Sequence, residues 1–322
     1  MAKKAFAAAV NEALDEELRR DEDVYLAGED IGQYGGVFGA TQGLQAEYGK
    51  ERVRDTPLSE IAIAGHGLGA AVGGLRPVVE LQFADFLATA GDETVNQIAK
   101  QPYVSGGRLE APLTIRTPCG AGIGAAAQHS QSVHAWVGHQ AGLVVVAAST
   151  PYDAKGLLKS AIRDDNPVVF LEHKALYGKK GDVPETEYTL PLGKAAVERE
   201  GSDVTVVATQ QMFHRSMAAA DELEEEADVE VLNPRTFAPL DLETIYESVN
   251  RTGRLVVVDE TPLRYGTQTH IAGKVASEAF WSLDAPPRVL GVDDVPVPFS
   301  PPLEAEVLPS TEEIIDGIRS VF

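Results

Sequence analysis

Short, largely apolar runs alternate along this chain with segments of helical character, and this alternation constrains the fold most. The runs are rich in valine, leucine and isoleucine, and lie at residues 24–27, 77–81, 113–116, 143–147, 168–171, 204–208, 229–232, 255–258 and 288–290. A strand that is apolar throughout is buried on both faces, as in parallel sheets covered by helices. The sequence therefore predicts an α/β fold with mainly parallel sheets.

Helix signals lie between these runs. Every fourth residue from Phe6 to Leu18 is apolar, and charged residues at positions 12, 15–17, 19 and 20 surround them, which predicts an amphipathic helix. Thr150 can cap a helix that has Pro151 at its first position and continues to Arg163. Further helices are expected at residues 213–227 and 311–321, whereas the proline-rich tail at 296–309 is expected to be extended.

The pattern divides into two α/β domains. A length of 322 residues exceeds what one ordinary core occupies. Charged and turn residues interrupt the pattern near residue 180, before strand signals resume at residue 204. We expect domains at residues 1–185 and 202–322, joined by a linker at 186–201.

The composition limits the partners. The chain has 49 acidic and 27 basic residues, for a formal net charge of −22. Such a surface repels nucleic acid and anionic membranes. It suits a protein that works in strong salt, where screening weakens the self-repulsion, so we expect a halophilic cytoplasm. An ordinary acidic protein explains the same charge.

Cysteine usage and hydropathy indicate a soluble cytoplasmic protein. Cys119 is the only cysteine, so no internal disulfide can form and no cysteine cluster can hold a metal. The apolar start of the chain ends at Asn11, too soon for a signal peptide. The apolar, glycine-rich run at residues 61–75 is shorter than a membrane span.

Glu60 is the first candidate for chemistry. It precedes an apolar run with no other acid or fixed charge before Arg76. Ser59 can cap a helix there, which would place Glu60 in the first turn beside the helix dipole. Capping alone explains an acid at this position. If buried, the carboxylate would also be a strong hydrogen-bond partner for a protonated ring nitrogen and a proton relay.

Glycines and histidines give weaker signals. The loop at residues 120–124 follows a strand and could cradle an anion, but it lacks the residues of a P-loop or a dinucleotide fingerprint, so tight packing is the simpler reading. His129, His134 and His139 are five residues apart, which on a helix points successive side chains apart and excludes a shared metal. Polar neighbours at residues 130–132 make His129 the most interesting of the three, although a structural histidine is the simpler interpretation of this segment.

The segment at residues 160–167 ends a helix beside Asp164 and Asn166. Helix C-terminal carbonyls and such side chains suit a hard cation. A plain helix-to-strand turn explains the same residues.

Six motifs in order resemble the beta subunit of the thiamine-diphosphate-dependent decarboxylase component of 2-oxoacid dehydrogenase complexes, a family that covers pyruvate, branched-chain 2-oxoacid and acetoin dehydrogenases. They lie at residues 55–60, 80–86, 105–107, 126–131, 152–157 and 160–168, and the resemblance runs from about residue 5 to 322. It implies a pyrimidine-binding domain followed by a transketolase-type C-terminal domain.

The resemblance implies roles for individual residues. Glu60 matches the carboxylate that hydrogen-bonds the cofactor pyrimidine and favours its imino form, and His129 matches the histidine that assists acyl transfer to lipoamide. The positions around the aminopyrimidine match Glu29, Leu58, Gln82 and Phe86. A potassium site matches Leu113, Ala161, Ile162, Asp164 and Asn166.

The resemblance also implies partners. The chain lacks the Gly-Asp-Gly signature that holds magnesium and diphosphate, which the alpha subunit carries in this family. We therefore expect a two-alpha, two-beta heterotetramer that decarboxylates pyruvate or a branched-chain 2-oxoacid and passes the acyl group to a lipoyl acyltransferase. The alternatives are an acetoin dehydrogenase beta subunit, the C-terminal half of a split transketolase or 1-deoxyxylulose-5-phosphate synthase, or a subunit that resembles the electron-transfer flavoprotein beta chain.

Overall fold

The computed structural model describes residues 1–322 and divides into two compact units. The first unit comprises residues 1–119 and 136–192, and the second comprises 120–135 and 193–322. The second unit starts inside the range expected to be a linker, because strand β9 (Ala196–Arg199) pairs at the edge of its sheet. The segment 120–135 also belongs to the second unit, which the order of the motifs did not indicate.

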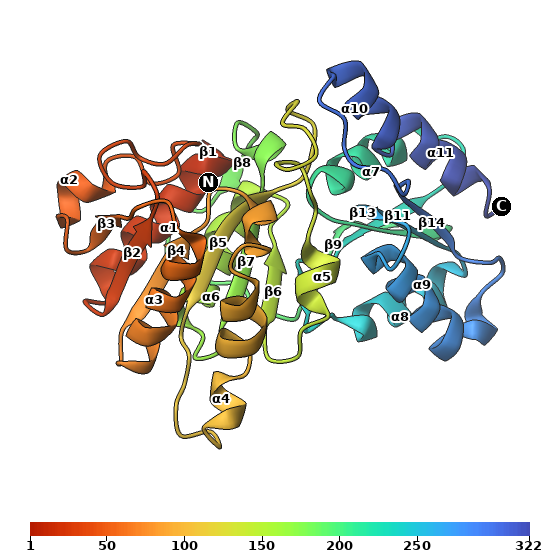
Figure 1. Ribbon diagram of the computed structural model, residues 1–322. Coiled ribbons are helices and arrows are strands. Elements are labelled where there is room, and N and C mark those ends of the chain that lie inside the picture. The colour runs from red at the N-terminus through yellow and green to blue at the C-terminus, as the bar shows by residue number, and fades with distance from the viewer. The chain divides into compact units, whose positions relative to one another are not determined.

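The first unit contains a parallel sheet with the strand order β6–β7–β5–β4–β2–β3 (Figure 1). Its strands are β2 (Val24–Gly28), β3 (Val53–Asp55), β4 (Arg76–Glu80), β5 (Thr114–Cys119), β6 (Val144–Ala147) and β7 (Val168–His173). Its longer helices are α1 (Phe6–Arg20), α3 (Glu60–Val72) and α6 (Pro151–Arg163). Strands β1 (Ala2–Ala5) and β8 (Lys180–Val183) form a separate antiparallel pair.

Short elements complete the first unit. They are α2 (Leu44–Tyr48), a 3₁₀ turn (Ala84–Leu87), a π-helical segment (Glu93–Ile98), α4 (Gln101–Val104) and a 3₁₀ turn (Lys174–Leu176). Helix α5 (His134–Gly138) spans the change from the second unit back to the first.

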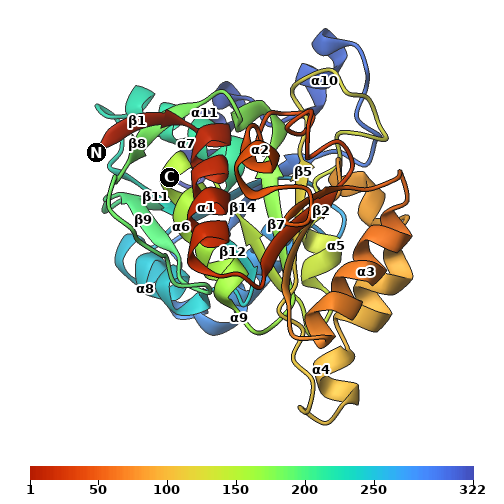
Figure 2. The same cartoon turned by 90° about the vertical axis from the view of Figure 1, so that its left-hand side faces the viewer.

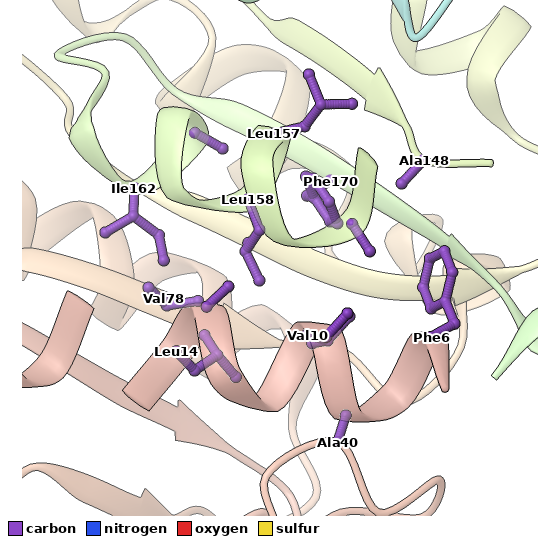
Figure 3. Packing of buried hydrophobic residues seen from close by; sticks show 14 of the residues in the cluster. Phe6, Val10, Leu14, Ala40, Val78, Ala148, Leu157, Leu158, Ile162 and Phe170 are labelled. Atoms are coloured by element: carbon purple, nitrogen blue, oxygen red, sulfur yellow. The ribbon is translucent and has the colours of Figure 1, made fainter. Parts of the chain in front are cut away.

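Helices α1 and α6 pack together on one face of this sheet, and α3 lies on the other (Figure 2). Figure 3 shows Val10 and Leu14 of α1 facing Leu158 and Ile162 of α6. The expected four-residue spacing is confirmed, because the apolar positions of α1 are its buried face. Thr150 Oγ1 accepts from the backbone N–H of Asp153 at 3.0 Å, which confirms the predicted cap of α6.

The second unit repeats the α/β pattern. Its sheet has the order β14–β13–β10–β11–β9, in which only β9 runs antiparallel. The remaining elements are β10 (Val204–Ala208), α7 (Gln210–Glu222), β11 (Val229–Asn233), β12 (Thr236–Ala238), α8 (Leu242–Thr252), β13 (Leu255–Pro262), α9 (Thr267–Glu278), a 3₁₀ turn (Phe280–Ser282), β14 (Arg288–Val292), α10 (Pro301–Val307) and α11 (Thr311–Arg319). Separate apolar clusters involve α7 with α11 and α8 with α9.

The predicted α/β class with mainly parallel sheets is confirmed, but the extended tail is wrong in part. Residues Pro301–Val307 form helix α10, with the two prolines in its first turn. Proline is tolerated there because the first N–H groups of a helix have no intrahelical partner. The helix expected at residues 213–227 is α7, which begins at Gln210 and stops at Glu222, so residues 223–227 lie beyond its end. None of the helices combines the length and apolar composition needed to cross a bilayer.

Candidate active site

Three neighbouring parallel strands end where the sequence placed most of its candidate residues. In the register of the sheet, Gly28 at the end of β2 lies opposite both Asp55 of β3 and Glu80 of β4. The Thr56 N–H donates to the Gly28 carbonyl at 2.9 Å and continues this alignment. Ligands of such sheets bind beyond the carboxyl ends of the strands. Residues that follow β2, β3 and β4 therefore share one edge, namely Glu29, Leu58, Glu60, Gln82 and Phe86.

Glu60 is the first residue of α3 and is half-buried. The expected capping by Ser59 is wrong in detail, because its side chain makes no capping hydrogen bond; only its carbonyl accepts, from the Ile63 N–H at 2.9 Å. The positive end of the helix dipole nonetheless favours an anion at this position. Leu58 beside it is 71% exposed, so this edge presents an apolar side chain next to a carboxylate.

Glu29 lies within electrostatic range of Glu60. Burial raises the pKa of Glu29, and the charges of Asp30 and Glu60 raise it further. Burial and like charge both disfavour the ionised form. The edge thus gathers carboxylates whose negative charges repel one another, and perturbed carboxyl pKa values of this kind cluster at functional sites.

Aromatic rings lie next to these carboxylates. Half-buried Phe86 meets Phe83 edge to face at 5.6 Å between ring centroids, and Phe83 meets Phe38 in the same way at 6.0 Å. Phe38 in turn stacks on Tyr177 at 4.9 Å. Such packing fixes the Phe86 ring without burying it fully.

A buried ionic network lies directly behind this edge. Arg116 of β5 forms a bidentate pair with Glu172 of β7 at 2.7 and 2.9 Å, and donates to Glu80 of β4 at 2.7 Å. The Tyr177 hydroxyl donates to Glu172 at 2.8 Å. All four side chains are buried. The sequence reasoning missed this network, although each charge stands in or at the end of an apolar strand, which was the available signal.

The network holds two carboxylates against one guanidinium. Burial raises the pKa of Glu80, and Arg116 only partly opposes this. Burial disfavours the charged form of Arg116, but Glu172 and Glu80 outweigh it and raise the pKa of Arg116. Burial and Glu172 also raise the pKa of Tyr177, so its hydroxyl stays a donor. The network therefore keeps Arg116 charged behind strands β4, β5 and β7.

His129 lies in the second unit, in the loop at residues 120–135. It is half-buried, and its N–H donates to the Ala126 carbonyl at 3.3 Å. Ala126 has a φ of +63°, a left-handed conformation that is strained for alanine. Of the polar neighbours expected at residues 130–132, the hydroxyls of Ser130 and Ser132 are buried and make no hydrogen bond.

Carboxylates of the second unit hold this loop. Glu304 of α10 accepts from the N–H groups of Gly122 and Gly124 at 2.8 and 2.9 Å. Buried His134 pairs through Nε2 with Asp259 at 2.8 Å, and the Ala121 N–H donates to Glu260 at 3.2 Å. The glycine loop thus cradles an anion, as its composition allowed, and the anion is the chain's own Glu304.

The residues expected to bind potassium lie at the end of α6 and the start of β5. The Val168 N–H donates to the Leu113 carbonyl at 2.9 Å, which brings the two segments together. Arg76 donates to the carbonyls of Ile162 and Asp164 at 3.2 and 3.1 Å, and the Asp164 carboxylate accepts from Asn166. A guanidinium therefore already contacts two of the five expected residues, which also include Ala161.

Comparison with protein families identifies two segments. Residues 2–180 match the transketolase pyrimidine-binding domain, and residues 193–314 match the transketolase C-terminal domain. Among solved structures, a split-gene transketolase described as an inactive beta4 tetramer superposes with a TM-score of 0.81, covering 98% of this chain and 97% of that one. Its 22% sequence identity supports the fold alone.

Curated relatives match over nearly the whole chain. The beta subunit of acetoin:2,6-dichlorophenolindophenol oxidoreductase from Cupriavidus necator is 46% identical over 98% of this chain and 96% of its own length. The pyruvate dehydrogenase E1 component subunit beta from Bacillus subtilis is 45% identical over 100% and 99%. The 2-oxoisovalerate dehydrogenase subunit beta from the same organism is 43% identical over 97% of each.

Proposed function

We propose, from the premise that this chain belongs to the family of 2-oxoacid dehydrogenase E1 beta subunits with their transketolase-type domains, that it supplies the pyrimidine-binding half of a thiamine-diphosphate-dependent decarboxylase. The reaction is oxidative decarboxylation of pyruvate or a branched-chain 2-oxoacid, with acyl transfer to a lipoyl group. The observation that carries this proposal is the alignment of β4, β2 and β3, whose ends bring the candidate residues to one edge.

The residues at this edge fit an aminopyrimidine. Glu60, half-buried at a helix N-terminus, would accept a hydrogen bond from a protonated ring nitrogen, and Glu29 and Gln82 would bind the neighbouring polar atoms. The Phe86 ring and exposed Leu58 would cover the faces of the ring. Thiamine diphosphate, when bound, supplies the electron sink for decarboxylation, and this chain supplies placement and proton transfer.

The assembly we propose contains two alpha and two beta subunits, with a lipoyl acyltransferase as acyl acceptor. The alpha subunit would hold magnesium and the diphosphate, because this sequence lacks the Gly-Asp-Gly signature for them. The exposed apolar side chains beside Glu60, Leu58 and Ile61 at 71% and 51%, suit a surface that a partner covers. The net charge of −22 and the single buried Cys119 suit a salt-rich, reducing cytoplasm.

Potassium is part of the same proposal. The carbonyl oxygens at the end of α6 and the Asp164–Asn166 turn are the ligand type that a hard cation prefers. Each carbonyl that Arg76 contacts has a second lone pair, so the guanidinium and a cation can share them. Bound there, potassium would tie the start of β5 to the α6–β7 turn.

Reconstitution with the alpha subunit tests the function. The purified complex should release carbon dioxide from pyruvate or a branched-chain 2-oxoacid in the presence of thiamine diphosphate, magnesium and a lipoyl domain. Cleavage of acetoin in place of both would reassign the substrate to that of the acetoin enzymes. Transfer of ketol groups between sugar phosphates, with no acyl transfer, would overturn the proposal in favour of a split transketolase.

The isolated chain should bind thiamine diphosphate weakly. Magnesium and diphosphate provide much of the charge-assisted binding, and those ligands would come from the alpha subunit. Titration calorimetry with magnesium and thiamine diphosphate should show no saturation at micromolar concentrations for the chain alone, and stoichiometric binding after the alpha subunit is added. Tight binding by the chain alone would show that the diphosphate site is misassigned.

His129→Ala should damage acyl transfer more than cofactor binding. A residue that donates or accepts a proton in the transition state contributes about 10²- to 10⁴-fold to rate. We expect acyl transfer to a lipoyl domain to fall by at least about 100-fold, with the cofactor dissociation constant within about threefold of the wild-type value. His139, exposed and ten residues further along the chain, provides the matched His139→Ala control. Wild-type acyl transfer in His129→Ala would make His129 structural.

A further inference from the structure

We propose that Glu304 is a positioning residue: its buried carboxylate fixes the loop that carries His129 and so sets the place of that imidazole. The effect on catalysis rests on the proposed function. The contact between Glu304 and the loop does not, because both belong to the second unit. Glu304 is 3% exposed and lies on α10, whose sequence gave no sign of a functional role.

Both carboxylate oxygens of Glu304 accept a hydrogen bond from the loop. Oε1 accepts from the Gly122 N–H at 2.8 Å and Oε2 accepts from the Gly124 N–H at 2.9 Å. Gly122 and Gly124 have φ values of +95° and +68°, a left-handed conformation that side chains disfavour. The two alternate N–H groups turned to one side in this way form a concavity for an anion, similar to the concavities that backbone N–H groups form in other loops. The loop is shaped around a carboxylate, and α10 delivers it.

Other contacts fix where the loop lies relative to Glu304. The Gly120 N–H donates to the Gln131 carbonyl at 3.2 Å, so the loop is closed at its base, with Glu304 bound inside it and His129 between the two ends. Ala121 packs in a small apolar cluster with Leu308, which follows α10. The carboxylate and this apolar contact together fix α10 against the loop.

A buried carboxylate is a costly choice for a contact that only stabilises. Removing it from water is repaid only when good hydrogen bonds satisfy it, and apolar groups of similar volume often stabilise equally well. Two charge-assisted bonds to alternate N–H groups do what an apolar contact cannot, since they fix the direction of the backbone. Gly124 is five residues before His129, and the Ala126–His129 turn transmits that direction.

Three substitutions separate position from charge and from stability. Glu304→Gln keeps the shape of the side chain but has one acceptor oxygen in place of two. Its NH₂ group is a donor and would face one of the two backbone N–H donors that a carboxylate oxygen now binds. Glu304→Asp keeps the charge and withdraws it by one methylene, so it cannot reach both N–H groups. Glu306→Gln, on the exposed face of the same helix, is the matched control.

The first measurement needs no activity. Hydrogen–deuterium exchange of the full chain, read at the peptide containing residues 119–131, should speed up in Glu304→Gln and Glu304→Asp and stay unchanged in Glu306→Gln. Exchange in peptides from strands β10 and β13 should stay at the wild-type rate, because the loop is not part of either sheet. Unchanged exchange in both Glu304 variants would overturn the proposal.

The second measurement uses the complex reconstituted with the alpha subunit. Misplacing a catalytic group by about 1 Å costs about 100-fold, so both Glu304 variants should lose about that factor in kcat for acyl transfer, with little change in KM. Added to His129→Ala, Glu304→Gln should cause no further loss, because both act through one imidazole. Losses that multiply, or a fully active Glu304→Asp, would overturn the positioning role. A wild-type complex inactive on every 2-oxoacid would refute the proposed function instead, and exchange would still decide whether Glu304 holds the loop.

Discussion

Glu60→Gln should abolish most turnover in the reconstituted complex while leaving the fold and the assembly intact. Glutamine has the same shape and fills the same half-buried place at the start of α3, so packing changes little. It cannot carry the negative charge that holds a proton on the ring nitrogen of the pyrimidine. Loss of one proton-transfer group lowers rate by about 10²- to 10⁴-fold, and we expect a loss in that range.

Proton exchange at the thiazolium carbon of the cofactor tests this directly. The rate of hydrogen–deuterium exchange at that carbon, measured in the assembled complex, should fall as far as turnover does. Glu51→Gln is the control. The Glu51 carboxylate is 95% exposed, and its ion pair with Arg54, at 3.6 Å, lies at the surface. Exchange at the wild-type rate in Glu60→Gln would remove Glu60 from the proton path and leave it as a dipole partner of α3.

Local sequence signals predicted most strands and helices of the chain, but not the three-residue strand β3 beside the site, which forms no apolar run. The apolar run at 204–208 is strand β10 with the same bounds, and the first helix starts at Phe6 as its spacing predicted. Because parallel strands end at one edge, finding β2, β3 and β4 together is enough to gather Glu29, Glu60 and Gln82. The sequence motifs identified these residues as candidates. The register of the strands shows that they lie close together.

Contacts between distant parts of the sequence could not be predicted in this way. The loop at 120–135 joins the second unit because its partners are Glu260 and Glu304, the latter 182 residues from Gly122. No periodicity encodes such a pairing. Prolines in the first turn of α10 concealed the helix that delivers Glu304. In the sequence, the charged residues of the Arg116 network look like those that commonly end a strand. Their pairing is not visible there, because the partners lie on neighbouring strands that are far apart in the sequence.

Arg116→Met should be among the most destabilising substitutions in the first unit. Methionine can fill the space of the arginine stem, but it leaves buried Glu172 and Glu80 without their counter-charge. Breaking a buried pair by removing one partner costs about 3–5 kcal/mol. For a protein of this size such a loss lowers the melting temperature by roughly 10 °C. Arg19→Met is the control, because Arg19 is 62% exposed and surface pairs contribute about 0–1 kcal/mol.

The pH dependence identifies the cause. A carboxyl whose pKa is higher in the folded than in the unfolded protein binds more protons when folded, so stability falls as pH rises from the ordinary glutamate pKa through the raised value. Burial already raises the pKa of Glu80 with Arg116 present. Without the guanidinium this effect on Glu80 should grow, because Arg116 opposes it. The stability deficit of Arg116→Met should therefore shrink when the pH is lowered from 8 toward 5.

A second substitution distinguishes unpaired charge from lost packing. Glu172→Gln in the Arg116→Met background removes the more buried of the two charges and still accepts the hydrogen bond of the Tyr177 hydroxyl. The double variant should unfold at a higher temperature than Arg116→Met alone, because the single variant carries an uncompensated buried carboxylate and the double variant does not. If the two losses added, and the deficit of Arg116→Met did not depend on pH, the arginine would stabilise the sheet through its packing. The charge of Arg116 would then contribute nothing to the stability of the buried Glu80 and Glu172.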